Sequence, residues 1–192
     1  MKLALFGYGG HAKEVACQIG GDFTFFVDDK YSNNMVKPIS EFNHEEYSIM
    51  IAVSNPVMRE EVVNKLHIDT DFFTFIHPTA QIMGDNVNIG EGSFIGANCI
   101  LTEDINLGDH SILNRGVHIG HDSNLDNYFT SMPNSVVSGN VNFGKYGYMG
   151  TNSTVIEKIT ITNNVTIGAG GVVVKNITNS GVYVGVPTKQ IK

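Results

Sequence analysis

The strictest constraint in the sequence is a six-residue repeat that keeps its phase from Met83 to Val173 without an insertion. Fifteen of the sixteen residues at this spacing are apolar, and Ser131 is the one exception. The residue that follows is glycine at eight of the sixteen positions. A period of six fits neither an α-helix nor a coiled coil, and an alternating strand would not be interrupted so regularly by glycine. Short strands joined by turns fit it, which predicts a parallel β-helix with the repeated residue inside.

Two further positions of the repeat support this interpretation. Two residues before each inward position the side chain is usually small or β-branched, and we expect it to share the interior, as at Ser93, Cys99, Ser111, Val117, Ser135 and Val165. Three residues after the inward position, Asn occurs seven times and Gly three times. Asn and Gly are the residues that most readily adopt a positive φ. The sequence therefore predicts a left-handed corner residue at that position of each repeat.

The first third of the chain has a different pattern, that of a small parallel α/β domain. Apolar strands are expected at 2–6, 24–27 and 48–53. A helix is expected after the first strand, where Ala12, Val15, Ala16 and Ile19 have helical spacing and Gly20-Gly21 ends it. A second helix should begin with Asn55 as N-cap and Pro56 at the first position, and run to about residue 66. The pattern ends near residue 74, too early for the two halves of a complete dinucleotide fold.

The loop after the first strand, Gly7-Tyr8-Gly9-Gly10-His11-Ala12, matches G-x-G-x-x-G/A, and two acids follow about 20 residues later. Glycines let a phosphate approach backbone N–H groups at a helix N-terminus, and an acid can accept a ribose hydroxyl. The short domain favours a nucleotide or a nucleotide-sugar over a full NAD site. The alternative is that these are turn glycines only.

Charge and composition exclude several other classes. The formal net charge is −7, which disfavours nucleic-acid binding. Residues 145–192 nevertheless contain five lysines and one acid, which suits an anionic small molecule or a solvated surface. Cys17 and Cys99 form neither a disulfide framework nor a zinc quartet. With no signal peptide and no apolar stretch of about 18 residues, we expect a cytoplasmic protein without membrane insertion.

The repeat resembles the left-handed β-helix of the hexapeptide acyltransferases, whose coils are triangular and 18 residues long. The whole chain resembles the bacterial nucleotide-4-aminosugar N-acetyltransferases of the sialic-acid O-acetyltransferase-like family. The matching segments are GYGGHA, the Asp28-Asp29 pair, IHPTA (76–80), LNRGVHIGHD (113–122) and GVYVGVPTK (181–189). The resemblance implies a small Rossmann-like α/β N-terminal domain at 1–74, a left-handed parallel β-helix of hexapeptide repeats at 75–180, and a C-terminal tail at 181–192. It also implies a homotrimer with acetyl-CoA bound between adjacent helices.

His121 is the candidate for the base. It lies two residues after the inward Ile119 and therefore falls in a corner turn, where an ordinary surface role is the alternative. The resemblance implies that His121 is the general base and that Asp122 beside it raises its basicity. His118 should point outward from a flat face, and His110 should be a turn residue. The two-residue gap between His118 and His121 does not resemble the zinc ligands of β-helical carbonic anhydrases, so we expect no metal.

The remaining site residues follow from the resemblance position by position. Those implied to hold the nucleotide-sugar are Gly9, Gly10, His11, Asp28, Asp29, Ser54 and Asn114. Those implied to contact acetyl-CoA through their backbone are Thr151 and Ala169. Thr130 is a departure, because the family has a second His there, near acetyl-CoA. Lys175 and Lys189 are expected, from their place in the basic C-terminal segment, to contact the phosphates of the coenzyme.

The resemblance thus implies an acetyl-CoA-dependent N-acetyltransferase. Its acceptor would be the 4-amino group of a nucleotide-linked 4-amino-4,6-dideoxy sugar, with UDP as the expected nucleotide, and transfer would be direct. An O-acetyltransferase acting on sialic acid or a related sugar would share the fold, base and donor. A nicotinamide oxidoreductase would leave the β-helix unexplained, and a structural protein would not need the His-Asp turn.

Overall fold

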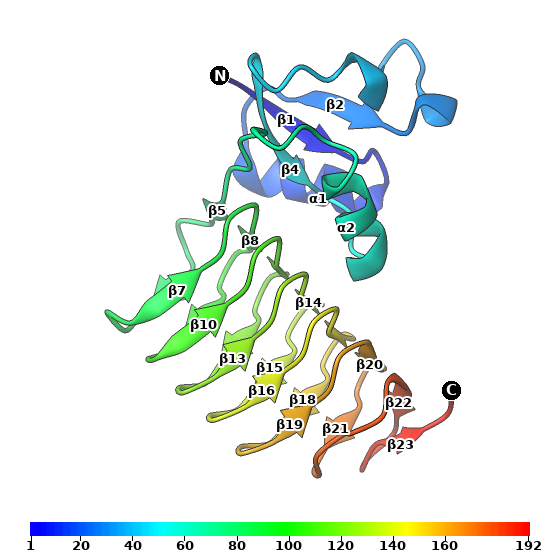
Figure 1. Cartoon of the computed structure of the whole chain (residues 1–192). Coiled ribbons are helices and arrows are strands. Elements are labelled where there is room, and N and C mark those ends of the chain that lie inside the picture. The colour runs from blue at the N-terminus through cyan, green and yellow to red at the C-terminus, as the bar shows by residue number, and fades with distance from the viewer.

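The computed structural model describes all 192 residues and shows two parts, a small α/β domain and a stack of triangular coils (Figure 1). The α/β domain has one parallel sheet in the order β3-β2-β1-β4. Its strands are β1 (Lys2–Phe6), β2 (Thr24–Val27), β3 (Lys37–Pro38) and β4 (Tyr47–Ile51). The helices are α1 (Gly10–Ile19) and α2 (Pro56–Val63), with short 3₁₀ turns η1 (Asp29–Tyr31) and η2 (Ile39–Glu41).

The expected elements of this domain are present, with differences in detail, and the strand expected at 48–53 is observed as β4 at Tyr47–Ile51. The side chain of Asn55 accepts a hydrogen bond from the Met58 N–H at 3.0 Å, as an N-cap should, and α1 ends at Gly20 with φ 74°. The second helix ends at Val63 rather than near residue 66. Strand β3 was not expected, because Lys37–Pro38 is too short and too polar to stand out as an apolar run.

The coils form three parallel sheets, which we call the first, second and third faces. The first face contains β5 (Phe75–Ile76), β8 (Phe94–Ile95), β11 (Ile112–Leu113), β14 (Thr130–Ser131), β17 (Tyr148–Met149), β20 (Val165–Ile167) and β22 (Gly181–Val184). The second contains β6 (Gln81–Ile82), β9 (Ile100–Leu101), β12 (His118–Ile119), β15 (Val136–Val137), β18 (Thr154–Val155) and β21 (Val172–Val173). The third contains β7 (Val87–Ile89), β10 (Ile105–Leu107), β13 (Asn124–Leu125), β16 (Asn142–Phe143) and β19 (Thr160–Ile161).

The register gives the coil its length, because His118 pairs with Val136, 18 residues later, and most strands keep this spacing. Exceptions lie at the ends of the stack, where Phe75 pairs with Phe94 and Val165 with Gly181. The inward residues of the repeat are buried from Ile95 to Val173, Ser131 included, and they form one core. The hydroxyls of Ser131 and Ser135 pair with each other inside this core, which satisfies the one polar inward position. Met83 is exposed, because no complete coil covers the start of the stack.

The corner prediction is confirmed along most of the helix. Every sixth residue from Gly92 to Gly170 has a positive φ between 52° and 69°. These residues are Gly92, Asn98, Asp104, His110, Gly116, Asp122, Tyr128, Asn134, Asn140, Tyr146, Asn152, Lys158, Asn164 and Gly170. The prediction is wrong for Asn86 and Asn176, which lie at the two ends of the stack.

The α/β domain packs on the first face. Leu5, Ala12 and Met50 share an apolar cluster with Phe94 and Ile112 of that face. At one edge, the side chain of Gln18 accepts from the Ala97 N–H at 2.9 Å, and α1 also forms an ion pair between Glu14 and Arg115. At the other edge Glu60 of α2 pairs with Lys145 at 2.7 Å. The first face is therefore covered over its first coils by the α/β domain.

The segment predicted as a tail continues the first face. Strand β22 pairs in parallel with β20, and β23 (Lys189–Gln190) turns back antiparallel to β22. No helix in the structure combines the length and the apolar character that crossing a bilayer requires.

Candidate active site

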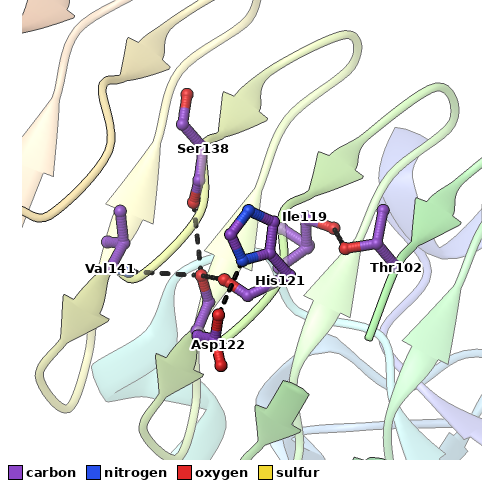
Figure 2. A network of polar contacts seen from close by, with 7 residues as sticks. Thr102, Ile119, His121, Asp122, Ser138 and Val141 are labelled. Atoms are coloured by element: carbon purple, nitrogen blue, oxygen red, sulfur yellow. Dashed lines mark hydrogen bonds and ion pairs between the residues drawn. The ribbon is translucent and has the colours of Figure 1, made fainter. Parts of the chain in front are cut away.

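His121 lies in the turn between β12 and β13, at the corner where the second and third faces meet. Its Nδ1 is 2.7 Å from Oδ2 of Asp122, the corner residue with φ 57° (Figure 2). Both side chains are exposed, His121 by 65% and Asp122 by 54%. Because the carboxylate accepts the hydrogen bond from Nδ1–H, the imidazole keeps its Nε2 lone pair free and directed away from the turn.

The turn that carries this pair is fixed to the next coil by the buried Ser123. Its hydroxyl donates to the carbonyl oxygen of Ser138 at 3.2 Å and accepts from the Val141 N–H at 3.2 Å (Figure 2). The hydroxyl of Thr102 donates to the Ile119 carbonyl at 3.3 Å, on the other side of the turn. The pair is therefore held by neighbouring coils on both sides, although it is open to solvent.

The loops predicted to hold a nucleotide-sugar meet at one edge of the parallel sheet, because the carboxyl ends of β1, β2 and β4 all lie there. Gly9 and Gly10 are exposed, and a Cβ on either would meet open space. Asp28 pairs with Lys65 at 3.0 Å, and Asp29 accepts from the Ser40 N–H at 3.1 Å. The two acids therefore already have partners within the domain.

His11 has unused hydrogen-bonding capacity in this region. Both ring nitrogens are buried and have no partner. Burial, and next the positive charge of Arg59, lower the pKa of His11 to about 4. The ring is therefore neutral at neutral pH and can donate from one nitrogen and accept at the other.

Arg59 of α2 was not found from the sequence. It is completely buried, and its guanidinium donates to the carbonyl oxygens of Val53 (2.6 Å), His110 (2.7 Å) and Tyr128 (2.7 Å), and to the hydroxyl of Thr130 (2.9 Å). A signal was present in the sequence, because Pro56, Arg59 and Val62 are three residues apart and therefore lie on one side of α2. A charged residue between two apolar ones on that side indicates a buried arginine. This one side chain connects the loop after β4 with two coils of the β-helix.

The structure places Thr130 under the α/β domain. Its side chain is fully buried, accepts from Arg59, and donates to the carbonyl oxygen of Ser54 at 3.0 Å. The side chain of Thr130 is therefore covered by the α/β domain, and its contact with acetyl-CoA remains a proposal from the resemblance. Thr130 also joins the β-helix to the loop that carries Ser54.

The other predicted residues lie at two different corners. Asn114, Thr151 and Ala169 follow first-face strands, and thus share the corner between the first and second faces. Asn114 is 1% exposed and its side chain accepts from the Arg115 N–H at 2.7 Å, whereas Thr151 and Ala169 are exposed. Since His121 occupies the opposite end of the second face, one chain does not bring it together with Asn114.

Lys175 and Lys189 are brought together. Both line a cavity of about 270 Å³ at the C-terminal end of the stack, beside Thr188 and Tyr183. Lys175 occupies the same corner as His121, three coils further along the axis. His110 is a corner residue as expected, but it is also buried, with its ring stacked on Tyr128 at 5.3 Å between centroids.

The chain is similar to known proteins over its N-terminal part and over its whole length. Residues 2–66 match the model of the PglD N-terminal domain. PerB from Caulobacter crescentus, solved with CoA and GDP-perosamine, is 27% identical over 100% of this chain and 98% of its own, with a TM-score of 0.87. A histidine-to-asparagine variant of perosamine N-acetyltransferase from the same organism, with the same ligands, is 26% identical over 100% and 97% of the chains, with a TM-score of 0.87. The acetyltransferase domain of PglB from Neisseria gonorrhoeae, solved with acetyl coenzyme A, is 29% identical over 99% and 98%, with a TM-score of 0.86.

The fold and its corner sites define the class as a left-handed β-helix acetyltransferase with a small α/β domain in front. Within that class, the chain is similar over its whole length to perosamine N-acetyltransferase and to the acetyltransferase domain of PglB, and its residues 2–66 match the PglD N-terminal domain. The predicted fold class and family resemblance are confirmed.

Proposed function

We propose that the protein transfers an acetyl group from acetyl-CoA to the 4-amino group of a nucleotide-linked 4-amino-4,6-dideoxy sugar. The observation that carries the proposal is a free imidazole, oriented by a carboxylate at 2.7 Å, on a fold whose similar structures hold CoA and GDP-perosamine or acetyl coenzyme A. The choice of UDP as nucleotide, and of the amine precursor of UDP-N-acetylbacillosamine as acceptor, rests on the resemblance of the sequence. Since PerB was solved with GDP-perosamine, GDP-linked amines are the alternative to test.

His121 would act as the general base. A sugar ammonium must lose one proton before its nitrogen can attack a thioester, and the attacking amine loses a second proton as the amide forms. Imidazole is suited to take a proton near neutral pH. Asp122, accepting from Nδ1–H, fixes the tautomer with Nε2 free and stabilises the imidazolium that forms. The amine nitrogen then bonds to the acyl carbon, backbone N–H groups stabilise the oxyanion, and the C–S bond breaks to release CoA. Direct transfer of this kind needs no acyl-enzyme.

The complete site would form between copies of the chain. Within one chain the α/β domain covers the first face, while His121 is at the corner opposite to that face. We infer a homotrimer in which the His121 corner of one copy faces the Thr151 and Ala169 corner of the next. Acetyl-CoA would then lie between two β-helices, with its phosphates near Lys175 and Lys189.

The outward side chains of the faces support this arrangement. On the second face the outward column alternates between polar residues (Gln81, His118 and Thr154) and half-buried apolar ones (Ile100, Val136 and Val172). On the third face the outward positions form a ladder of asparagines, and Asn106 donates to Asn124 at 2.8 Å. A face with half-buried apolar residues favours self-association more than a ladder of amides, which suits solvent. The second face is therefore the better surface for contact between copies.

A thiol-release assay with acetyl-CoA tests the proposal, using UDP-, dTDP- and GDP-linked 4-amino sugars and sialic acid as acceptors. We expect turnover with a nucleotide-linked amine and none with sialic acid. Turnover with sialic acid alone would replace the proposal by O-acetylation, and no turnover with any amine would reject it.

A matched pair of variants tests the base. His121→Ala should reduce kcat by at least about 100-fold, the range for losing a general base, with the oligomer unchanged. His67 offers a control, because it is an exposed histidine whose Nδ1 lies 3.5 Å from Asp69, in the α/β domain rather than in the β-helix. His67→Ala should keep wild-type activity. Equal effects of the two substitutions would assign the base to another residue.

A further inference from the structure

We propose that the sugar ring of the acceptor lies in the cavity between the start of α2 and the first face, where Tyr148 and Thr166 determine which sugar is accepted. This inference rests on the proposed function and adds to it the residues that contact the sugar and select it. The cavity has a volume of about 420 Å³, within the usual range of small-ligand sites. Besides the first turn of α2, its walls are Ser54, Asn55, Tyr146, Tyr148, Asn164 and Thr166.

The cavity begins where the cover of the α/β domain ends. The outward positions of the first face form one column, in which Ile112 pairs with Thr130, Thr130 with Tyr148, and Tyr148 with Thr166. Ile112 and Thr130 are buried under the α/β domain. The next two residues of the column, Tyr148 and Thr166, are only half-buried and form the floor of the cavity. They are therefore the first outward side chains of this face that a ligand can reach.

The lining is polar but carries no charged side chain. The hydroxyl of Tyr146 already donates to Glu60 at 2.5 Å, whereas those of Tyr148 and Thr166 have no partner in the chain. Free hydroxyls and amides beside aromatic rings suit a neutral, hydroxylated ring with apolar C–H groups, and they do not suit a diphosphate. Glu60, behind Tyr146, is already paired with Lys145, so no free carboxylate would hold the amine in its unreactive ammonium form.

The cavity also lies between the regions proposed for the nucleotide and for acetyl-CoA. Ser54 belongs both to its wall and to the loop at the carboxyl end of β4, beside the predicted nucleotide loops. In the other direction β17 and β20 lead directly to Thr151 and Ala169, the positions implied for acetyl-CoA. A larger hollow of about 510 Å³ beside β2 and β3 contains none of the predicted site residues. The sugar would thus lie between its nucleotide and the acyl donor.

The test compares nucleotide-sugar binding with binding of the free nucleotide. The variants are Thr166→Val and Tyr148→Phe, which each remove one hydroxyl at nearly constant volume, and Tyr148→Ala, which also removes the ring. The probes are the best nucleotide-sugar substrate of the acceptor panel, the matching free nucleoside diphosphate, and acetyl-CoA. Thr160→Val is the matched control, because Thr160 is an exposed outward threonine of β19 on the third face.

We expect each hydroxyl deletion to raise the KM for the nucleotide-sugar about 5- to 10-fold, the worth of one hydrogen bond, and Tyr148→Ala to raise it further. The Kd of the free nucleoside diphosphate and the KM for acetyl-CoA should stay at wild-type values. Unchanged nucleotide-sugar kinetics in all three variants would overturn the inference, and so would an equal loss of affinity for the free nucleotide. If the wild-type enzyme itself turned over no amine, the proposed function would fail instead, so the two failures are distinguishable.

Discussion

The imidazole of His121 lies directly over Gly139, the residue at the same corner one coil further along. A Cβ on residue 139 would stand 2.7 Å from both Cε1 and Nε2 of the ring, closer than real Cβ contacts come. The place of the ring beside Asp122 therefore depends on the absence of a side chain in the next coil. Because His121 is exposed, the ring can move away without disturbing the core.

Gly139→Ala should therefore reduce activity without unfolding the protein. The added methyl displaces the ring from its contact with Asp122, and a base misplaced by about 1 Å can cost 100-fold in rate. We expect kcat to fall 10- to 100-fold with little change in either KM or the melting temperature. The check is a double-mutant cycle, in which Gly139→Ala should have no further effect once His121 is already Ala. Fully additive losses would show that Gly139 acts by another route.

Much of the β-helix follows from periodicity, because each residue of a coil meets the same position of the next. The inward Ile119 and the corner residue Asp122 could both be placed by counting in sixes. The counting fails at the ends, where Met83 and the corner positions Asn86 and Asn176 lack a neighbouring coil on one side. The sequence of each hexapeptide favours a strand and a turn, and packing against the coils on both sides gives every hexapeptide the same backbone conformation.

The contact between the two parts of the chain could not be predicted in the same way. Thr130 has the sequence character of any outward residue of a coil, and only the docking of α2 buries it beneath Arg59. Its hydrogen bonds join residues 71 and 76 positions apart, a separation that no local pattern encodes. The corner position of His121 follows from the six-residue period. Its role as a general base comes from the family resemblance, and the His121→Ala variant tests it.

Arg59→Met should destabilise the protein strongly. Met fills most of the same volume, but it leaves the buried carbonyls of Val53, His110 and Tyr128 without their donor. Each buried acceptor left unpaired costs about 1–3 kcal/mol, so with three of them we expect a loss of at least about 3 kcal/mol in urea unfolding. Arg115→Met is the matched control, because Arg115 is an exposed arginine in an ion pair with Glu14 and should contribute about 1 kcal/mol or less. Similar losses for both variants would contradict the role assigned to Arg59.

Stability should fall as the pH is lowered from about 6.5 to 4. Burial lowers the pKa of both His11 and His110 to about 4, so in this window the unfolded chain binds protons that the native protein does not. The free energy of unfolding then increases with pH, by up to about 1.4 kcal/mol per pH unit for each histidine. Urea titrations at several pH values measure this slope.

His110→Asn provides the control for that measurement. Asn tolerates the φ of 53° at this corner, so the fold should persist while one titrating group is removed. The slope below pH 6.5 should decrease by about one proton relative to the wild-type protein. An unchanged slope would mean that His110 does not take up a proton on unfolding.

The left-handed corners predict opposite effects for two exposed positions. Asn140 has φ 58°, and Asn140→Ala replaces a residue that tolerates this region by one that does not, at a cost of about 1 kcal/mol. Lys158 has φ 61°, and Lys158→Gly should relieve the same strain and raise stability by up to about 1 kcal/mol. Asn142→Ala is the control, since Asn142 is exposed in extended strand β16 and should change stability by less than about 0.5 kcal/mol. If urea unfolding gave Asn140→Ala and Asn142→Ala the same effect, the left-handed backbone would not be what selects Asn in this repeat, and the amide side chain itself would have to explain it.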